Sequence, residues 1–205
     1  VIRTKGSTPQ KPGAKLLVRE DGSGVGTLGG GCVEGDIWFA AKMLLNEGGE
    51  SQLQDYNLNE DIAAREGLVC GGTMYFLIDP VRDTKDLTSA VGKIVDAYDG
   101  GTSMGQATLL KPSNSKGSVG DKLFLETDGS VSGSLGDAKR DKEAVGALKG
   151  LMDYGRVNYL NTEDGAEIFL EGFTTPASVV IAGGGHIGKS LAPLVKMLGL
   201  KLYVV

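Results

Sequence analysis

The sequence predicts an α/β protein in two parts: a mixed α/β domain over residues 1–173, and the beginning of a second domain over residues 177–205. Two observations carry this prediction. Segments with the length and alternation of strands are interspersed with segments of helical periodicity throughout the first part. In residues 179–205, a hydrophobic strand, a glycine-rich turn, an amphipathic helix and a second strand follow one another. The Thr-Thr-Pro sequence at 174–176 is expected to be the linker.

The first half of the first part is expected to hold several strands and one helix. Residues 14–21 alternate like a strand that closes at an Asp21-Gly22 turn. Residues 36–46 have apolar positions at helical spacing, with Asp36 as N-cap and Gly48-Gly49 as a stop. Further strands are expected over residues 51–58 and 73–79, the latter buried and ended by Pro80, with a short polar helix or loop over 59–66.

The remainder of the first part is expected to continue the alternation. Helices are predicted over residues 84–99 and 137–152, and Asp137 has the residue type and position of an N-cap. The sequence Asp128-Gly129 predicts a hairpin turn. Strands are expected over residues 106–110, 122–126, 156–160 and 167–173.

Residues 179–205 are expected to form the opening β-α-β of a Rossmann unit, because Gly183, Gly185 and Gly188 fall in the G-x-G-x-x-G frame between strand and helix. Gly183 would make the tight turn, Gly185 would let the backbone approach a pyrophosphate, and Gly188 would let helix and strand pack closely. The helix N-terminus would offer N–H groups to an anion, with His186 as a turn residue near the phosphate. One β-α-β cannot bury both faces of its sheet, so this second domain is expected to be incomplete.

The glycine spacing alone is a weak signal in this chain. The same spacing occurs at Gly24, Gly26 and Gly29, where it follows a turn instead of a strand. There it is expected to be a loop or hairpin. For the C-terminal match, the structural alternative is a β-α-β that needs glycine only for packing.

Composition excludes several classes of protein. The 205 residues carry a net charge of −5, so a basic face for nucleic acid or an anionic membrane is not expected. No apolar run reaches the ~18 residues of a membrane-spanning helix. Two cysteines do not make a disulfide framework, and a cytoplasmic location is expected. The 33 glycines exceed the ordinary usage of ~7% and gather in motifs, where a backbone turns sharply or approaches a ligand.

Three glycine-rich segments of the first part are candidate sites. Gly6-Ser7, between two lysines, could present N–H and hydroxyl groups to an anion, and the alternative is a plain surface turn. Gly29-Gly30-Gly31-Cys32 precedes a predicted helix, whose N-terminus favours a thiolate. Glu34 could carry a proton or only complement the helix dipole. Cys70-Gly71-Gly72 precedes a buried strand, where a cysteine is more often a small core residue. The paired glycines suggest that the two cysteine loops share one site.

Taken in order, these motifs resemble the XdhC/CoxI family, accessory proteins of molybdenum hydroxylases such as xanthine dehydrogenase and carbon monoxide dehydrogenase. The matching segments are GSTPQKPGAKLLV (6–18), GTLGGGCVEGDI (26–37), GLVCGGTMYFLIDP (67–80), EIFLEGFTTP (167–176) and VVIAGGGHIGKSLAPLVKMLG (179–199). With Cys32 in the sequence GGGCVEG, the chain resembles the CoxI-type branch of the family. Gln10 departs from the family, which has a basic residue there, so a phosphate contact would have to come from Lys5 or Lys11 instead.

The resemblance implies a maturation factor, a role that is not classical catalysis, and any enzymatic activity would be of the oxidoreductase type. Such a factor binds the molybdenum cofactor in its molybdopterin or dinucleotide form. It assists sulfuration by a cysteine desulfurase and passes the cofactor to an apo molybdenum hydroxylase. It implies that Cys32 and Cys70 face the molybdenum or its sulfido ligand. Glu34 would also be a cofactor-binding residue. The backbone cradle would be Gly6, Ser7, Gly29, Gly30, Gly31, Gly71 and Gly72. Gly183, Gly185, His186 and Gly188 would hold a nucleotide or pyrophosphate. A homodimer is expected.

Two other functions compete with this one. The first is an NAD(P)-dependent oxidoreductase that uses the Rossmann segment, although no residue is an evident acid or base for hydride transfer. The second is an interaction scaffold for a hydroxylase, in which the glycines are only structural. If the cofactor reading holds, the turn at 183–188 is expected to face the two cysteine loops across one cleft, because ligand sites favour clefts between domains.

Overall fold

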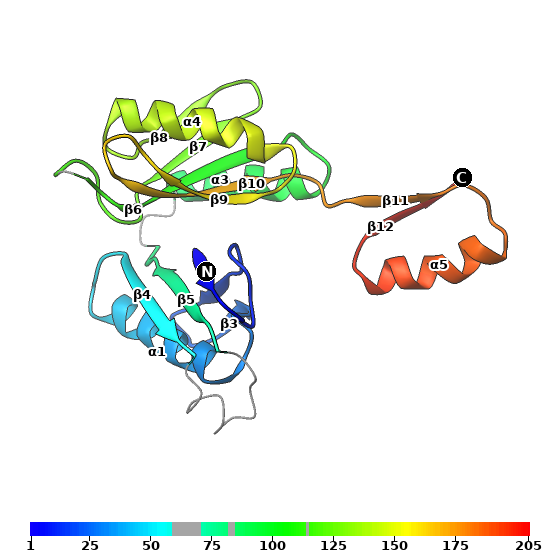
Figure 1. The fold of residues 1–205 in the computed structure, drawn as a ribbon, viewed down its shortest axis with the longest axis horizontal. Helices are drawn as coiled ribbons and strands as arrows, with labels where there is room; N and C mark the ends of the chain where they lie inside the picture. Colours follow the sequence, from blue (N-terminus) through cyan, green and yellow to red (C-terminus); the bar gives the residue numbers. More distant parts are fainter. Residues whose placement is uncertain (59–70, 82–84, 114) are drawn as a thin grey trace.

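The computed structural model describes residues 1–58, 71–81, 85–113 and 115–205 (Figure 1). The polar helix or loop expected over residues 59–66, and Cys70 with it, lie outside the described residues. The chain folds as a mixed α/β protein, as predicted, with four described helices and several sheets. Of these helices, none has the length and apolar character that crossing a bilayer requires.

The first half of the chain is built on an antiparallel three-stranded sheet. Its strand order is β1-β5-β4, and a separate hairpin pairs β2 with β3. The bounds are β1 Arg3–Lys5, β2 Leu16–Val18, β3 Gly24–Gly26, α1 Gly31–Asn46, β4 Gln52–Asn57 and β5 Thr73–Ile78. The hairpin confirms that Gly24, Gly26 and Gly29 belong to a hairpin and loop. Helix α1 packs on the sheet through Val33 and Ile37, which are one helical turn apart and both buried.

The second half forms an antiparallel five-stranded sheet in the order β8-β7-β6-β10-β9. The bounds are α3 Lys85–Tyr98, β6 Met104–Lys111, β7 Lys122–Glu126, β8 Val131–Gly133, α4 Ala138–Met152, β9 Val157–Asn161 and β10 Glu167–Phe173. The expected hairpin turn at Asp128-Gly129 joins β7 to β8. The predicted N-cap of α4 is confirmed, because the Asp137 carboxylate accepts a hydrogen bond from the Lys139 N–H at 3.0 Å.

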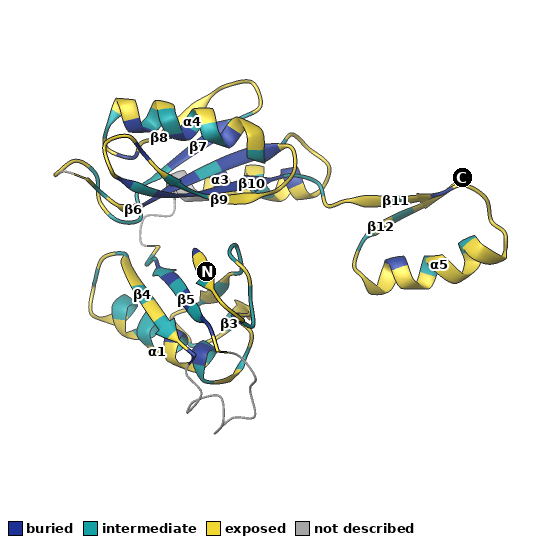
Figure 2. Cartoon of the chain, viewed as in Figure 1, coloured by how far each residue is buried: buried dark blue, intermediate teal, exposed yellow. Residues whose placement is uncertain are grey.

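The two halves stack as four layers, α4, five-stranded sheet, three-stranded sheet and α1 (Figure 1). The alternation of β5 explains the middle layers, since Met74, Phe76 and Ile78 point to α1 while Tyr75 and Leu77 point to the other sheet. The largest core lies between α4 and its sheet, where burial is most continuous (Figure 2). Helix α3 covers another part of the second sheet through Ala90.

The C-terminal segment is a parallel β-α-β unit made of β11 Ser178–Ile181, α5 His186–Met197 and β12 Lys201–Val204. A Cβ on Gly188 would lie 2.6 Å from the carbonyl oxygen of Gly183, so glycine is needed there for helix and strand to approach. The unit extends away from the two stacked sheets (Figure 1). Its assignment to a Rossmann domain, and the domain boundary at 173–177, stay predictions.

Helix α1 corrects one expected boundary. It begins at Gly31 with Gly30 as N-cap, so it is five residues longer at its N-terminus than the predicted 36–46. Asp36 does not cap it, and instead accepts a hydrogen bond from the Tyr56 hydroxyl at 2.9 Å. The helix starts early because a glycine turn with positive φ angles leads the chain directly into it.

Candidate functional site

Two of the predicted glycine loops lie directly against each other. A Cβ on Gly72 would lie 2.4 Å from the Lys5 carbonyl oxygen and 2.5 Å from that of Ser7. Conversely, a Cβ on Gly6 would lie 3.2 Å from the Gly72 Cα. The loop after β1 and the approach to β5 therefore meet backbone to backbone, which only glycine permits at these positions.

The third glycine loop joins the first through Pro9. A Cβ on Gly29 would lie 2.5 Å from the Pro9 Cβ, so the turn before α1 rests on the loop that holds Gly6 and Ser7. Gly29, Gly30 and Gly31 have φ angles of 107°, 75° and 66°, in the left-handed region that favours glycine. The structure thus brings the segments at 6–9, 29–31 and 71–72 into one cluster, which we call the glycine pole.

The Glu34 side chain holds the turn of the glycine pole. Its Oε2 accepts hydrogen bonds from the Thr27 hydroxyl at 2.8 Å, the Leu28 N–H at 2.8 Å and the Gly30 N–H at 3.2 Å. The Leu28 N–H, followed by the Thr27 hydroxyl, lowers the pKa of Glu34 below its usual range. A carboxyl that stays ionised at neutral pH is a poor proton carrier there. It also takes up the Gly30 N–H, which was expected to face an anion.

The Glu34 contacts give a pH prediction. A carboxyl whose folded pKa is lowered stabilises the fold above its unfolded pKa of about 4.3, and this contribution is lost as the pH falls through the folded value. Protection of the Leu28 N–H from hydrogen exchange, corrected for the intrinsic rate, is therefore expected to be constant above about pH 5 and to fall below about pH 4. Exchange measured by NMR across this range checks it, and a flat profile would contradict the clamp.

Cys32 is the second residue of α1 and half-buried. The N-cap Gly30 gives the helix no side-chain cap, and a Cβ there would meet nothing within 4 Å. The first turn of a helix leaves N–H groups without intrahelical partners, which favours a thiolate and nearby anions. Lys5 and Lys11 are both exposed on the adjoining segment. This chemistry fits a phosphate-bearing, sulfur-ligated group, although the Glu34 carboxylate reduces the positive potential.

The second predicted anion site is the turn before α5. Gly183 has a φ of 100°, Gly185 is the N-cap, and no acidic side chain lies in the first turn. Gly183, Gly184 and Gly185 are exposed, with open space around each Cβ direction. Such a turn can accept an anion on its N–H groups.

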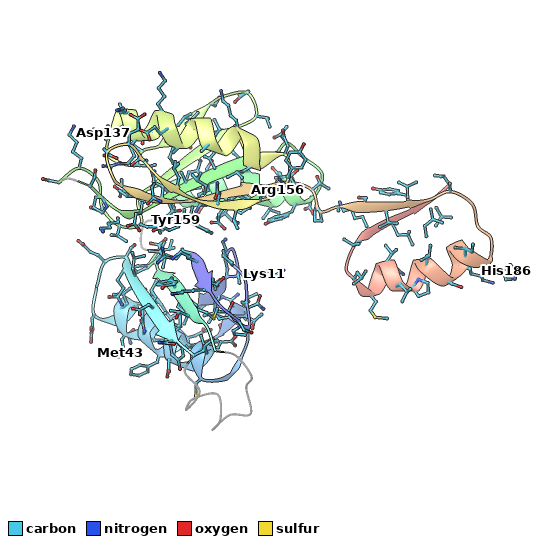
Figure 3. All side chains as sticks on the ribbon, in the orientation of Figure 1. Lys11, Met43, Asp137, Arg156, Tyr159 and His186 are labelled. Carbon is cyan, nitrogen blue, oxygen red and sulfur yellow. The ribbon has the colours of Figure 1, made fainter. Side chains whose placement is uncertain are left out.

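The structure contradicts a shared cleft within one chain. His186 lies at the outer end of the C-terminal unit, far from α1 and the glycine pole (Figure 3). The linker at 174–176 and strand β11 carry the unit away from both sheets. The two candidate anion sites are therefore separate in a single chain.

The described residues do not bring potential metal ligands together at the glycine pole. In those residues, no three His, Cys, Asp or Glu side chains are grouped so that they could hold a metal ion. The expected sulfur contacts consequently depend on Cys32 and on Cys70, which lies outside the described residues.

One feature near the sheets was missed from the sequence. A cavity of about 850 Å³ lies between the two halves, with Lys15, Thr108 and Glu171 among its lining residues. Glu171 is only 5% exposed and forms an ion pair with Lys15 across the interface. A second ion pair joins Lys122 of the second half to Asp79 of the first. A charged residue inside the apolar strand IFLEGF was the available signal for this interface.

Residues 1–57 match the model of the XdhC and CoxI family. The resemblance expected from the sequence is confirmed over these residues, which include two of the three loops of the glycine pole, Cys32 and Glu34. No curated protein matches the chain.

A solved structure from Bacillus halodurans, described as a xanthine dehydrogenase, has a similar fold. The TM-score is 0.67 at 23% sequence identity, and the likeness covers 100% of this chain and 56% of the other. The similarity in fold therefore extends over the whole chain, beyond the family match at residues 1–57. The chain spans little more than half the length of that structure.

Proposed function

We propose that the chain is an accessory protein of a xanthine dehydrogenase-type molybdenum hydroxylase, and that it binds a molybdopterin-type cofactor as cargo. The observation that carries the proposal is the glycine pole. Its loops at 6–9 and 29–31 come from the segment that matches the XdhC and CoxI family, and they pack against Gly72 from outside that segment. The similar structure from Bacillus halodurans also supports the proposal, because it is described as a xanthine dehydrogenase.

In this proposal, the N-terminal turn of α1 and the exposed Lys5 and Lys11 hold the phosphate of the cofactor. Cys32 faces the molybdenum or its sulfido ligand, since soft thiolates suit such a centre. Cys70 is a second sulfur contact on sequence grounds. A cysteine desulfurase supplies the sulfur, an apo-hydroxylase receives the cofactor, and the protein works as a homodimer in the cytoplasm.

A dinucleotide such as NAD(P) is the second candidate ligand. The parallel β11-α5-β12 unit favours it, because its glycine turn leads into a helix N-terminus with Gly188 packed on the strand. A cofactor in dinucleotide form would fit the same turn. Equilibrium binding of NAD⁺ and NADP⁺ distinguishes the two, since a pure cofactor carrier gives no saturable signal with either.

Replacing Cys32 with alanine is expected to lower retention of the cofactor by at least about tenfold, the loss of one favourable metal–sulfur or charge-assisted contact. Cys70→Ala is expected to lose less. Met43→Ala is the matched control, because Met43 lies near the opposite end of α1 (Figure 3) and is also partly exposed. Pterin fluorescence after gel filtration measures the occupancy. Wild-type occupancy in both cysteine variants would remove thiol contacts from the proposal.

A further inference from the structure

The two stacked halves have the same order of elements. Three strands, a helix and two strands follow one another as β1-β2-β3-α1-β4-β5 and again as β6-β7-β8-α4-β9-β10. Most sheet neighbours also correspond, since β1-β5-β4 matches β6-β10-β9 and the hairpin β2-β3 matches β7-β8. The copies differ in that β7 also pairs with β6, whereas β2 and β3 form a separate sheet. Each helix covers the outer face of its own sheet (Figure 1). Agreement in both order and pairing goes beyond a shared fold class.

The correspondence extends to individual residues. Residues 13–34 align with residues 120–141 without a gap, at a constant offset of 107. The two helices start at matching positions, Gly31 and Ala138. Residues identical in both segments are Gly13, Lys15, Leu16, Asp21, Gly22, Ser23, Gly26, Leu28 and Gly29 of the first, with Gly120, Lys122, Leu123, Asp128, Gly129, Ser130, Gly133, Leu135 and Gly136 of the second.

The hairpins of the two segments have the same contacts. Asp21 accepts from the Ser23 N–H at 2.8 Å, and Asp128 accepts from the Ser130 N–H at 2.8 Å. Gly26 and Gly133 both have positive φ angles. A Cβ on either glycine would lie 2.2 Å from the carbonyl oxygen of the lysine that begins the hairpin. Both hairpins therefore need glycine at this position for the same reason.

The turn between hairpin and helix is clamped by an acid in both segments. Glu34 accepts from the Thr27 hydroxyl and the Leu28 N–H, each at 2.8 Å. At matching positions, Asp141 accepts from the Ser134 hydroxyl at 2.8 Å and from the Leu135 N–H at 2.7 Å. In both, the hydroxyl also accepts from the N–H two residues later, at 3.0 Å.

We propose that the chain contains two copies of one β-β-β-α-β-β unit, and that the acid of the first helical turn is a positioning residue of that unit. Glu34 then holds the turn that presents Cys32, and it neither carries a proton nor contacts a ligand. A site that belonged to the ligand would have no reason to recur at Asp141, where the surroundings differ.

The differences between the copies show which one holds the ligand, a step that rests on the proposed function. Gly30 and Cys32 are replaced in the second copy by Asp137 and Lys139, which cap the helix and pair with Glu163. Val33 is replaced by Arg140, whose side chain is buried. The second helix start is thus closed by its own side chains, and the first copy alone keeps the residues that suit a cofactor.

The Arg140 side chain forms hydrogen bonds with the segments around the helix start of the second copy. Its Nη1 donates to the Leu135 carbonyl at 2.7 Å and to the Lys116 carbonyl at 3.0 Å, and its Nη2 pairs with Asp164 at 2.9 Å. The Ser113 hydroxyl, then that of Thr162, then Arg140 hold the pKa of Asp164 well below its usual range.

The test compares Glu34→Gln, Glu34→Asp and Asp141→Asn in the full chain, without any cofactor. Hydrogen exchange of the Leu28 and Leu135 N–H groups reports each clamp, and peptide-resolved mass spectrometry of iodoacetamide labelling reports Cys32. Glu34→Gln is expected to lower Leu28 protection and to speed Cys32 alkylation by about tenfold, with Leu135 unchanged. Asp141→Asn is expected to lower Leu135 protection only. Glu34→Asp, which introduces the acid of the second copy, is expected to restore Leu28 protection.

The proposal is overturned if Asp141→Asn leaves Leu135 protected, or if Glu34→Gln changes neither Leu28 nor Cys32. It is also overturned if Glu34→Asp behaves like Glu34→Gln, because the two acids would then not be equivalent. None of these readouts involves the cofactor. Failure of the proposed function would therefore leave them unaffected, and failure of the proposal would leave cofactor binding untouched.

Discussion

Replacing Gly72 with alanine is expected to destabilise the protein by about 3 kcal/mol, in the upper range for overpacking a close contact. The new Cβ would lie 2.4 Å from the Lys5 carbonyl oxygen, 2.5 Å from that of Ser7 and 2.8 Å from the Thr8 methyl group. Two of these neighbours are backbone atoms, which cannot rotate away. The loops of the glycine pole would have to separate. Urea denaturation followed by circular dichroism measures the free energy of unfolding.

Gly71→Ala is the matched control for this variant. A Cβ on Gly71 would meet nothing within 4 Å, so its stability is expected to remain close to that of the wild type. Equal free energies of unfolding for the two alanine variants would show that the 6–9 and 71–72 loops are not packed as described.

Arg140→Met is expected to cost about 2–3 kcal/mol of stability, because it removes the donor of the Leu135 and Lys116 carbonyls, and an unsatisfied buried acceptor costs about 1–3 kcal/mol, while Asp164 is partly exposed and adds less. The Arg140 side chain is fully buried, and it satisfies the Leu135 and Lys116 carbonyls as well as Asp164. A methionine fills similar volume but leaves these acceptors without their donor. Thermal and chemical denaturation both measure the loss.

The neighbouring Lys139 provides the control for Arg140. Its ion pair with Glu163 has both side chains mostly exposed, so Lys139→Met is expected to change stability little. If Arg140→Met proved as stable as Lys139→Met, the buried network would not hold the second half together, and the explanation for the closed second copy would fail.

Local signals in the sequence predicted most elements of the fold. The Asp137 cap, the Asp128-Gly129 hairpin and the β5 strand were found because each depends on residues adjacent in sequence. The start of α1 was missed because its N-cap is a glycine, which has no side chain to mark a helix start. The role of Glu34 also depends on a hydrogen bond from the Leu28 N–H, which the spacing of the residues does not predict.

Contacts between residues distant in sequence were harder to predict from the sequence. The clustering of the glycine loops was partly anticipated from the paired glycines at 71–72, but the contact between Gly72 and the Ser7 carbonyl is between residues distant in sequence. The cleft shared by the C-terminal unit and the cysteine loops was predicted wrongly for a single chain, since the linker at 174–176 carries no signal for direction. The internal duplication was visible as the shared Asp-Gly-Ser and Gly-Thr/Ser-Leu-Gly sequences, yet its meaning needed the two sheets.

Mass spectrometry of the small molecules released from the purified chain shows directly whether it carries a molybdopterin-type cofactor. The chain would be produced in a molybdenum-replete host and, as a control, in a host that cannot make the pterin cofactor. We expect a molybdopterin-type species in the first preparation, in molar proportion to the folded protein and strongly reduced by Cys32→Ala. A folded chain that releases no pterin from the replete host, and takes up none when the isolated cofactor is added, would contradict it.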